Sequence, residues 1–195
     1  MKRFVPYYTR QLVITVMLMS VLACASGGGG DKFRNPNMDF GSVQTVAVLP
    51  FTNLSRDQMA ADRVRDVFVT ALLASGDIYV IPVGEVAKGI GLAGIVNPSA
   101  PSSAEVMKLA PLIKANALIT GVLREYGEVR SGSSTANAIS LSLQMMDAQT
   151  GQVIWSTSTT KGGIGIKDRL LGGGGDPMNN ITEQAIKDLI NQLYE

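Results

Sequence analysis

Residues 138–147, AISLSLQMMD, alternate cleanly between apolar and polar side chains. The apolar positions are Ile139, Leu141, Leu143 and Met145, and the polar positions between them are Ser140, Ser142 and Gln144. A period of two residues places one set on each face of an extended chain, so the segment predicts a β-strand with one buried face. This feature constrains the fold most, because a strand of this kind needs both a strand partner and a layer to cover its apolar face.

Two neighbouring segments supply the strand partners. Residues 116–129 and residues 152–160 are both rich in β-branched and apolar side chains. The segment 130–137, RSGSSTAN, and the segment 148–151, AQTG, carry the residues typical of turns. Three strands joined by two turns predict an antiparallel meander over residues 116–160.

The first half of the chain alternates strands with helices. The continuous apolar run in residues 43–51, VQTVAVLPF, predicts a central strand covered on both faces, and residues 77–83, DIYVIPV, predict a second strand. Between them a helix is expected to begin at Ser55, which has the capping-box spacing with Gln58, and to stop at Gly76.

Three more helices complete the expected elements. One covers residues 84–92, and one runs from Ser102 to about residue 114, with Glu105 completing a capping box and Pro111 predicting a kink or break. The last begins at Asp176 as the cap, with Pro177 at the first helical position, after a segment 161–175 expected to be flexible. The fold class predicted is α/β: a mixed sheet of about five strands with helices packed on it, an α/β sandwich with an antiparallel meander in its second half.

The N-terminus has the pattern of a secretion signal. Lys2, Arg3 and Arg10 precede the apolar run QLVITVMLMSVLA at residues 11–23, which is shorter than the ~20 residues of a membrane-spanning helix. Cys24 follows at once, and the order Val21-Leu22-Ala23-Cys24 resembles the lipobox of bacterial lipoproteins. It departs from the usual box at two positions, with valine where leucine is commonest and the bulky Leu22 where a small residue is usual. The alternatives are an ordinary cleaved signal peptide and an uncleaved anchor.

The resemblance implies three segments. Residues 1–23 would be a lipoprotein signal peptide. Cys24 would carry S-diacylglycerol and an N-acyl chain such as palmitate, and residues 24–41, which are glycine-rich and polar, would be a lipidated flexible tether. Residues 42–195 would be a single domain. The residue after the cysteine is Ala25, not the aspartate that retains lipoproteins in the inner membrane of enteric bacteria, which favours the outer membrane.

Composition excludes several classes of function. The chain has no histidine, so Ser-His-Asp triads, Cys-His dyads and histidine-containing zinc sites are excluded. Three of the seventeen basic residues lie in residues 1–23, which leaves fourteen against sixteen acidic residues, a net charge of −2 without a basic run. Nucleic acid is therefore not an expected partner. One cysteine allows no internal disulfide, so stability must come from packing.

The remaining motifs have stronger structural than functional interpretations. GIGLAG at residues 89–94 spells a dinucleotide fingerprint but does not directly follow a strand. The run Gly172–Gly175 lacks the lysine of a P-loop, and a hinge is the alternative there to a plain linker. Asp57, Asp62 and Asp66 are interleaved with Arg63 and Arg65, which predicts a solvated, ion-paired helix face.

Two further candidates are a pair of glutamates and the single tryptophan. Glu125 and Glu128 are three residues apart on one strand, so they should lie on opposite faces and cannot pair as acid and base. Trp155 is expected to be a core or edge anchor, with ligand stacking as the alternative. The sequence thus predicts no catalytic, cofactor-binding or metal-ligating residue.

Three stretches carry a family resemblance: AVLPF at residues 47–51, ANALITGVL at 115–123 and DAQTGQVIW at 147–155. They resemble the CsgG family of bacterial lipoproteins, together with the N-terminal domain of TolB and the LpoB-type activators of penicillin-binding proteins. The resemblance covers about residues 43–160. It implies an α/β sandwich and a periplasmic assembly or scaffold role without catalysis, such as curli assembly or transport.

The predicted function is a non-catalytic component of envelope biogenesis or export, anchored to the outer membrane and facing the periplasm. Its expected partners are the membrane, through Cys24, and unidentified envelope proteins, with a homo-oligomer left open. Activation of a peptidoglycan synthase, as for LpoB, is an alternative, and a small carboxylate-dependent envelope enzyme is a weaker one. Because two transmembrane hairpins need roughly forty residues and the loops of this chain are shorter, the protein is not expected to line a pore by itself.

Overall fold

The computed structural model describes residues 32–131, 134–163 and 175–194. Cys24 and residues 1–31 lie outside the described residues, as does most of the segment 161–175 that was predicted to be flexible. The elements, in chain order, are β1 (Lys32–Arg34), a 3-10 turn η2 (Phe40–Ser42), β2 (Thr45–Val48), β3 (Thr52–Asn53), α2 (Ala60–Ser75), β4 (Tyr79–Val80), α3 (Val83–Ala93), α4 (Ser103–Ile113), β5 (Ala117–Ser131), β6 (Ser134–Asp147), β7 (Val153–Gly162) and α6 (Met178–Tyr194).

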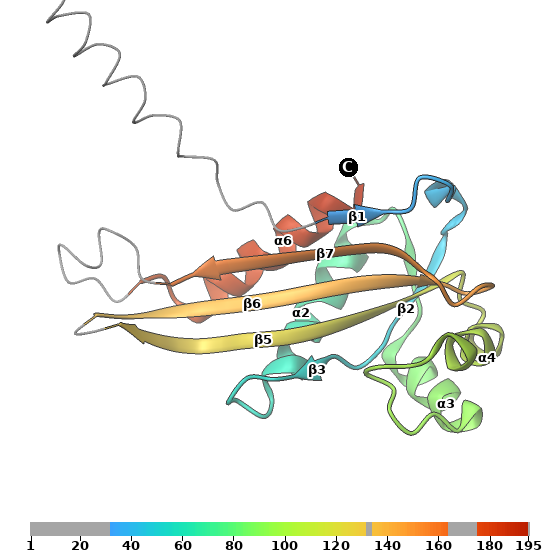
Figure 1. The fold of residues 1–195 in the computed structure, drawn as a ribbon, viewed down its shortest axis with the longest axis horizontal. Coiled ribbons are helices and arrows are strands. Elements are labelled where there is room, and N and C mark those ends of the chain that lie inside the picture. Colours follow the sequence, from blue (N-terminus) through green and yellow to red (C-terminus); the bar gives the residue numbers. More distant parts are fainter. Residues whose placement is uncertain (1–31, 132–133, 164–174, 195) are drawn as a thin grey trace, which may run out of the picture.

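The strands form one seven-stranded mixed sheet in the order β1-β7-β6-β5-β2-β4, with β3 pairing β5 beyond the end of β2. Strand β2 is parallel to both β4 and β5, whereas the β5–β6, β6–β7 and β7–β1 pairs are antiparallel. Figure 1 shows the β5–β6 hairpin running along most of the length of the molecule, with the shorter β7 beside β6. The α/β class and the meander over residues 116–160 are confirmed.

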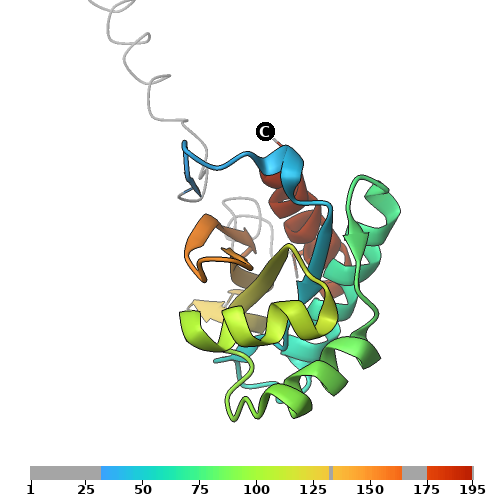
Figure 2. The same cartoon turned by 90° about the vertical axis from the view of Figure 1, so that its right-hand side faces the viewer.

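Helices cover the two faces of the sheet unequally. Helices α2 and α6 lie on one face, and α3 and α4 lie on the other face near one end of the strands (Figures 1 and 2). Two apolar clusters result: Val46 and Val48 of β2 pack with α2 and α6, while Ala47 and Leu49 pack with α3 and α4. The prediction that residues 43–51 contain a central strand covered on both faces is therefore confirmed.

The alternating strand is also confirmed. Ile139, Leu141 and Leu143 are fully buried on the α2/α6 side, and Met145 is almost fully buried there. Their polar neighbours lie on the opposite face of the sheet, where β5, β6 and β7 extend beyond α3 and α4. On that face Ser140 and Ser142 are half-buried and Gln144 is exposed. The core thus lies between the long strands and the pair α2 and α6.

The start of α2 differs from its prediction. The helix begins at Ala60, and Met59 at its N-cap makes no side-chain capping bond. The hydroxyl of Ser55 instead donates to Asn53 Oδ1 at 2.7 Å, and the side-chain amide of Asn53, Nδ2, donates to the carbonyl of Asp57 at 2.8 Å. The side chain of Asn53 therefore organises residues 53–58 as a loop, and the predicted Ser55/Gln58 capping box is wrong. The expected stop at Gly76 is confirmed, with φ +73°.

The long hairpin extends further than predicted. Residues 130–137 were expected to form a turn, but strand pairing continues through Arg130↔Thr135 to Ser131↔Ser134. Strand β7 likewise continues to Gly162. Backbone pairing with an already formed neighbour extends these strands into serine- and threonine-rich residues whose composition alone favours a turn.

The remaining helices follow the sequence closely. The Ser102/Glu105 capping box of α4 is present, and the helix runs through Pro111 to Ile113 without the predicted break. Pro111 lies in the last turn, where little helix remains to be disrupted. Helix α6 begins at Met178, so Pro177 precedes it, and the carbonyl of Pro177 accepts a hydrogen bond from the amide of Ile181.

Candidate functional site

The segment that precedes the globular domain is part of the sheet. Residues 24–41 were assigned to a flexible tether, but Lys32–Arg34 form β1, paired antiparallel to β7 with Phe33 opposite Ser156. The prediction of a tether is therefore wrong for these three residues. Eight Cα steps separate Cys24 from Lys32, which reach ~28 Å when fully extended.

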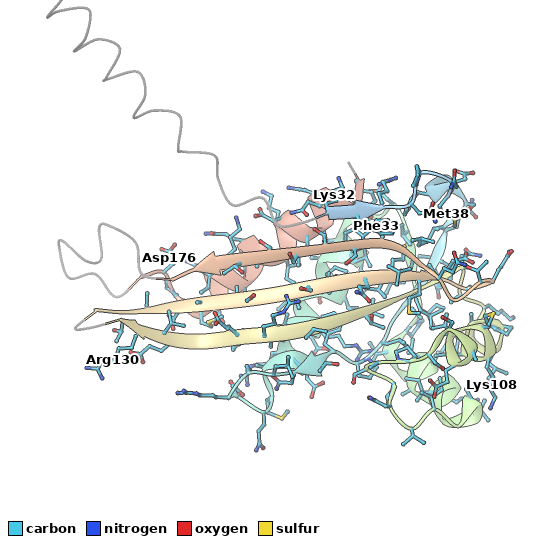
Figure 3. All side chains as sticks on the ribbon, in the orientation of Figure 1. Lys32, Phe33, Met38, Lys108, Arg130 and Asp176 are labelled. Carbon is cyan, nitrogen blue, oxygen red and sulfur yellow. The ribbon has the colours of Figure 1, made fainter. Side chains whose placement is uncertain are left out.

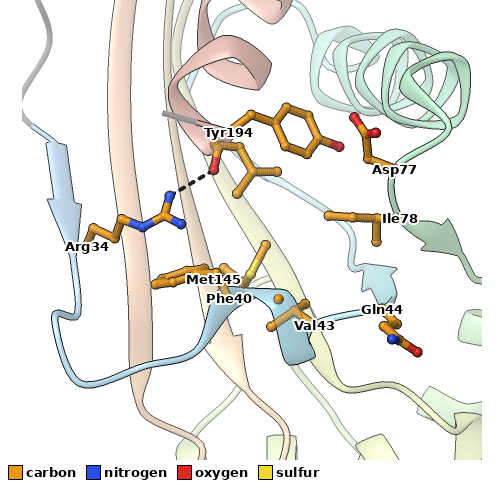
Figure 4. A pocket seen from close by; sticks show the side chains of 10 residues that line it. Arg34, Phe40, Val43, Gln44, Asp77, Ile78, Met145 and Tyr194 are labelled. Carbon is orange, nitrogen blue, oxygen red and sulfur yellow. Dashed lines mark hydrogen bonds between the residues drawn. The ribbon is translucent and has the colours of Figure 1, made fainter.

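A cavity of about 380 Å³ lies beside this segment (Figure 4). Its walls come from the chain after β1, the α2–β4 turn, β6 and the end of α6, and the apolar ones are Phe40, Val43, Ile78, Met145 and Leu193. Asp77 is its one carboxylate. This mixture can hold an apolar side chain, but it pairs no nucleophile with a base.

Arg34 connects the wall of this cavity to the end of α6. Its Nη1 donates to the carbonyl of Leu193 at 3.0 Å, and its guanidinium lies 3.9 Å from the ring centroid of Phe40. The hydroxyls of Tyr194 and Ser75 lie 2.9 Å apart in a second contact. A cation at the carbonyl end of a helix is favourable for the helix dipole, so Arg34 fastens the first strand to the last helix.

A second depression, of about 490 Å³, follows the edge of β5. The loop 54–56 forms one wall and residues 124–130 form the other, which brings together Arg56, Arg124, Arg130 and the two glutamates. Glu125 pairs with Ser140 across the hairpin and Glu128 pairs with Asn137, so the two carboxylates lie on opposite faces of the strand as predicted. They therefore do not form an acid–base pair.

The aspartate and arginine cluster of α2 is only partly the solvated face that was predicted. Asp57 accepts a hydrogen bond from the amide of Met59 at 3.0 Å and forms an exposed ion pair with Arg63. Arg65, however, is buried with 8% exposure, and its Nε and Nη2 lie 3.2 and 2.5 Å from the carbonyl oxygen of Val48. The prediction is wrong for Arg65.

The position of Arg65 follows from an interruption in the sheet. Ile81 donates its amide to the carbonyl of Val46, and the next outward carbonyl of β2 belongs to Val48. The amides of Tyr79 and Ile81 donate to the carbonyls of Gln44 and Val46, so the next donor in this ladder would be Val83, but Val83 already begins α3. Arg65 supplies the missing donor. Burial lowers the pKa of Arg65, while the charges of Asp66 and Asp62 oppose this shift.

The glycine motif at residues 89–94 is structural. It lies in the second half of α3, and Gly94 caps the helix with φ +65°. A Cβ on Gly89 would overlap Cγ2 of Ile113 and lie 3.1 Å from Cδ1 of Leu109 on α4. Gly89 therefore allows the two helices to approach closely. Residues 172–174 lie outside the described part.

Trp155 is a core anchor, as predicted: it is fully buried, and its Nε1 donates to the carbonyl of Gln192 at 3.3 Å. Another conspicuous carboxylate is that of Asp147, which accepts from the amide and hydroxyl of Thr150 at 2.8 and 2.9 Å. Asp147 thus fixes the β6–β7 turn, a role that the DAQTG stretch could have indicated.

Two searches of the described ranges found no site of another kind. In residues 32–131, 134–163 and 175–194, no three histidine, cysteine, aspartate or glutamate residues are placed to hold a metal ion. Over the same ranges, no helix has the length and apolar character needed to cross a membrane. The described residues line the two depressions above and a smaller one of about 160 Å³ beside Asn116 and Asp147.

Comparison with known families identifies the chain. Residues 39–193 match the family model described as "Putative lipoprotein GNA1162-like". The chain belongs to the GNA1162-like family. The match runs from before η2 almost to the end of α6 and leaves out β1, and it points to a lipid-anchored protein of the cell envelope. No curated protein matches the sequence.

Solved structures share the fold at low sequence identity. A single-residue variant of the PelC dodecamer from Paraburkholderia phytofirmans is 16% identical over 85% of this chain and 98% of that chain, with a TM-score of 0.57. Lipoprotein GNA1162 from Neisseria meningitidis is 18% identical over 77% of this chain and 98% of that chain, with a TM-score of 0.56.

A third neighbour is the LpoB C-terminal domain from Salmonella enterica, 17% identical over 74% of this chain and 93% of that chain, with a TM-score of 0.47. The resemblance expected from the sequence is supported at the level of a lipoprotein family, through the GNA1162-like match. The narrower CsgG and TolB labels are not supported.

Proposed function

We propose that this GNA1162-like protein is acylated at Cys24 and acts as a non-catalytic assembly component at the periplasmic face of the outer membrane. Membership of a lipoprotein family and the lipobox both support the anchor. The PelC structure that shares its fold is a dodecamer, so self-association is part of the proposal.

The observation that carries the proposal is the early start of the sheet. Strand β1 begins at Lys32, eight residues after Cys24. An acylated Cys24 would lie at the lipid surface, so the first residue of the sheet would stay within ~28 Å of it. This short reach suits a protein that works beside its own membrane.

The LpoB-like alternative needs a different geometry. An activator of a peptidoglycan synthase that starts from the outer membrane must reach across the periplasm, and the short segment between Cys24 and Lys32 disfavours such a reach. A carboxylate-dependent enzyme is also disfavoured, since Glu125 and Glu128 face opposite sides and Asp57 is paired with Arg63. Both alternatives are weaker than the assembly role.

Intact-mass analysis of protein extracted from membranes tests the anchor. The expected chain begins at Cys24 and carries the mass of a diacylglycerol and an N-acyl chain. The Cys24→Ser variant should lose the added mass and leave the membrane fraction while keeping its circular dichroism spectrum. A free thiol at residue 24 in the mature wild-type protein would refute the proposal.

Separation of inner and outer membranes on a sucrose gradient tests the location, and crosslinking in intact cells followed by pull-down tests the assembly role. The wild-type protein is expected in the outer-membrane fraction, crosslinked to envelope proteins or to itself. Specific crosslinks to a peptidoglycan synthase would favour the LpoB-like alternative instead.

A further inference from the structure

Among the residues that the structure describes, two edges of the sheet are unpaired at the same end of the molecule. Strand β3 pairs β5 only at Val122 and Leu123, so no described strand pairs with the outer side of β5 from Glu125 to Ser131. On the opposite side, β1 pairs β7 only from Trp155 to Thr157, which leaves Ser158–Gly162 unpaired within the described residues. Figure 1 shows both edges bordering the outer half of the long hairpin.

The β5 edge is accessible to another strand. It borders the depression of about 490 Å³ whose far wall is the loop 54–56. Gly127 lies on the floor of this depression with φ +122°, and a Cβ there would meet no atom within 4 Å. An interior strand glycine of this kind often marks a place where another backbone approaches closely.

The charges on the two edges are complementary. Glu128 pairs with Asn137 and Arg130 with Thr135, so both side chains project from the α6 side of the sheet. Neither forms an ion pair with a described residue, and Figure 3 shows Arg130 extending away from the outer end of β5. At the β7 edge, Lys161 projects from the same side and pairs with Asp188 of α6.

We infer that the free edge of β5 binds the free edge of β7 of a second copy of this chain. With the α6 sides of both copies on one face of the joined sheet, the two strands would lie parallel, because β5 and β7 run in the same direction within each copy. Glu128 and Arg130 of one copy would then face Lys161 and Asp188 of the next. Since the two surfaces differ, the contact is head-to-tail and repeats into a ring or chain of copies.

This inference deepens the self-association part of the proposed function and rests on it. A head-to-tail strand contact also leaves the β1 end and the 380 Å³ cavity available for other envelope components. It is therefore compatible with the assembly role rather than an alternative to it.

Crosslinking of paired cysteines tests the contact in the full chain, whose only native cysteine is proposed to be acylated. Val129 and Thr160 lie on the same face at the two edges, opposite Ala136 and Ser140 of β6. The double variant Val129→Cys/Thr160→Cys is expressed in cells and treated with a bismaleimide that spans ~10 Å, enough to bridge neighbouring strands directly or diagonally.

The double variant should give a ladder of dimers, trimers and larger species on denaturing gels, and each single variant should give none. A matched control pairs Thr160→Cys with Val96→Cys, because Val96 is 95% exposed and belongs to the α3–α4 loop rather than to either edge strand. Adding Glu128→Lys to the crosslinking pair should weaken the ladder, whereas Glu128→Gln should weaken it less.

Three results would overturn the inference. The first is a dimer from Val129→Cys alone, which would mean that β5 edges pair with each other. The second is an equal ladder from the Val96 control. The third is no ladder although maleimide labels both thiols. If Cys24 is acylated and the protein is in the outer membrane but no ladder forms, this inference fails while the proposed anchoring stands.

Discussion

Replacement of Arg65 by methionine tests whether a helix side chain completes the interrupted sheet. Methionine keeps the length and apolar stem of arginine but cannot donate to the carbonyl of Val48, which is itself 1% exposed. An unsatisfied buried carbonyl costs ~1–3 kcal/mol. Relief of the desolvation that lowers the pKa of Arg65 works in the opposite direction, so we expect Arg65→Met to lower the free energy of unfolding by ~1–2 kcal/mol.

Arg63→Met is the matched control, since it changes the same residue type two positions away on the same helix. Its side chain is 52% exposed and its partner Asp57 is 41% exposed, so the ion pair should contribute only ~0–1 kcal/mol. Urea unfolding followed through the fluorescence of Trp155, the only tryptophan, measures both variants. Equal losses in the two variants, or an unchanged Arg65→Met, would show that Val48 does not depend on this donor.

Five further substitutions and one reconstitution test other parts of the structure. Leu143→Ala should cost ~2–5 kcal/mol because Leu143 is fully buried, whereas Ser142→Ala on the opposite face should be nearly neutral by the same urea assay. Gly89→Ala should destabilise the protein despite the better helix propensity of alanine, and Gly91→Ala, which meets open space, should stabilise it by ~0.5–1 kcal/mol. Hydrogen bonds from Ser102 lower the pKa of Glu105. The ionised carboxylate of Glu105 therefore stabilises the fold at neutral pH, and this stabilisation is lost as the pH falls through the lowered pKa. The difference in the free energy of unfolding between wild type and Glu105→Gln should shrink in acid. Liposomes containing the full-length protein should show no dye leakage and no steady channel conductance, and reproducible channels would support a secretion channel.

Apolar periodicity was sufficient to predict the long elements. Each confirmed strand or helix has an apolar face whose periodicity is visible in the sequence of that segment alone. Examples are the alternation in β6 and the wide apolar face of α6. The capping box of Ser102 and the stop at Gly76 are also local, because their hydrogen bonds join residues within one turn.

The features missed by the sequence depend on contacts between distant residues. The segment Lys32–Arg34 has no strand periodicity and becomes β1 only because β7 offers a free edge. Arg65 has the sequence pattern of a surface charge, and it is buried because the chain turns into α3 at Val83 and leaves the carbonyl of Val48 without a strand donor. Ser55 does not cap α2 because its hydroxyl donates instead to the side-chain oxygen of Asn53. The two unpaired sheet edges depend on the ends of β1 and β3, which were not predicted.

The early start of the sheet places the proposed membrane anchor near the two free edges. Lys32 pairs with Thr157 and Arg34 with Trp155, so the chain enters the sheet from the side of the outer hairpin. An acyl anchor at Cys24 would therefore hold the membrane near the end that carries both free edges, within the ~28 Å that eight residues can span. Copies held on one membrane meet at a much higher effective concentration than copies in solution. A strand contact too weak to persist in solution would then suffice at the membrane, so removing the anchor with Cys24→Ser should weaken the crosslinked ladder even though no residue of the contact has changed.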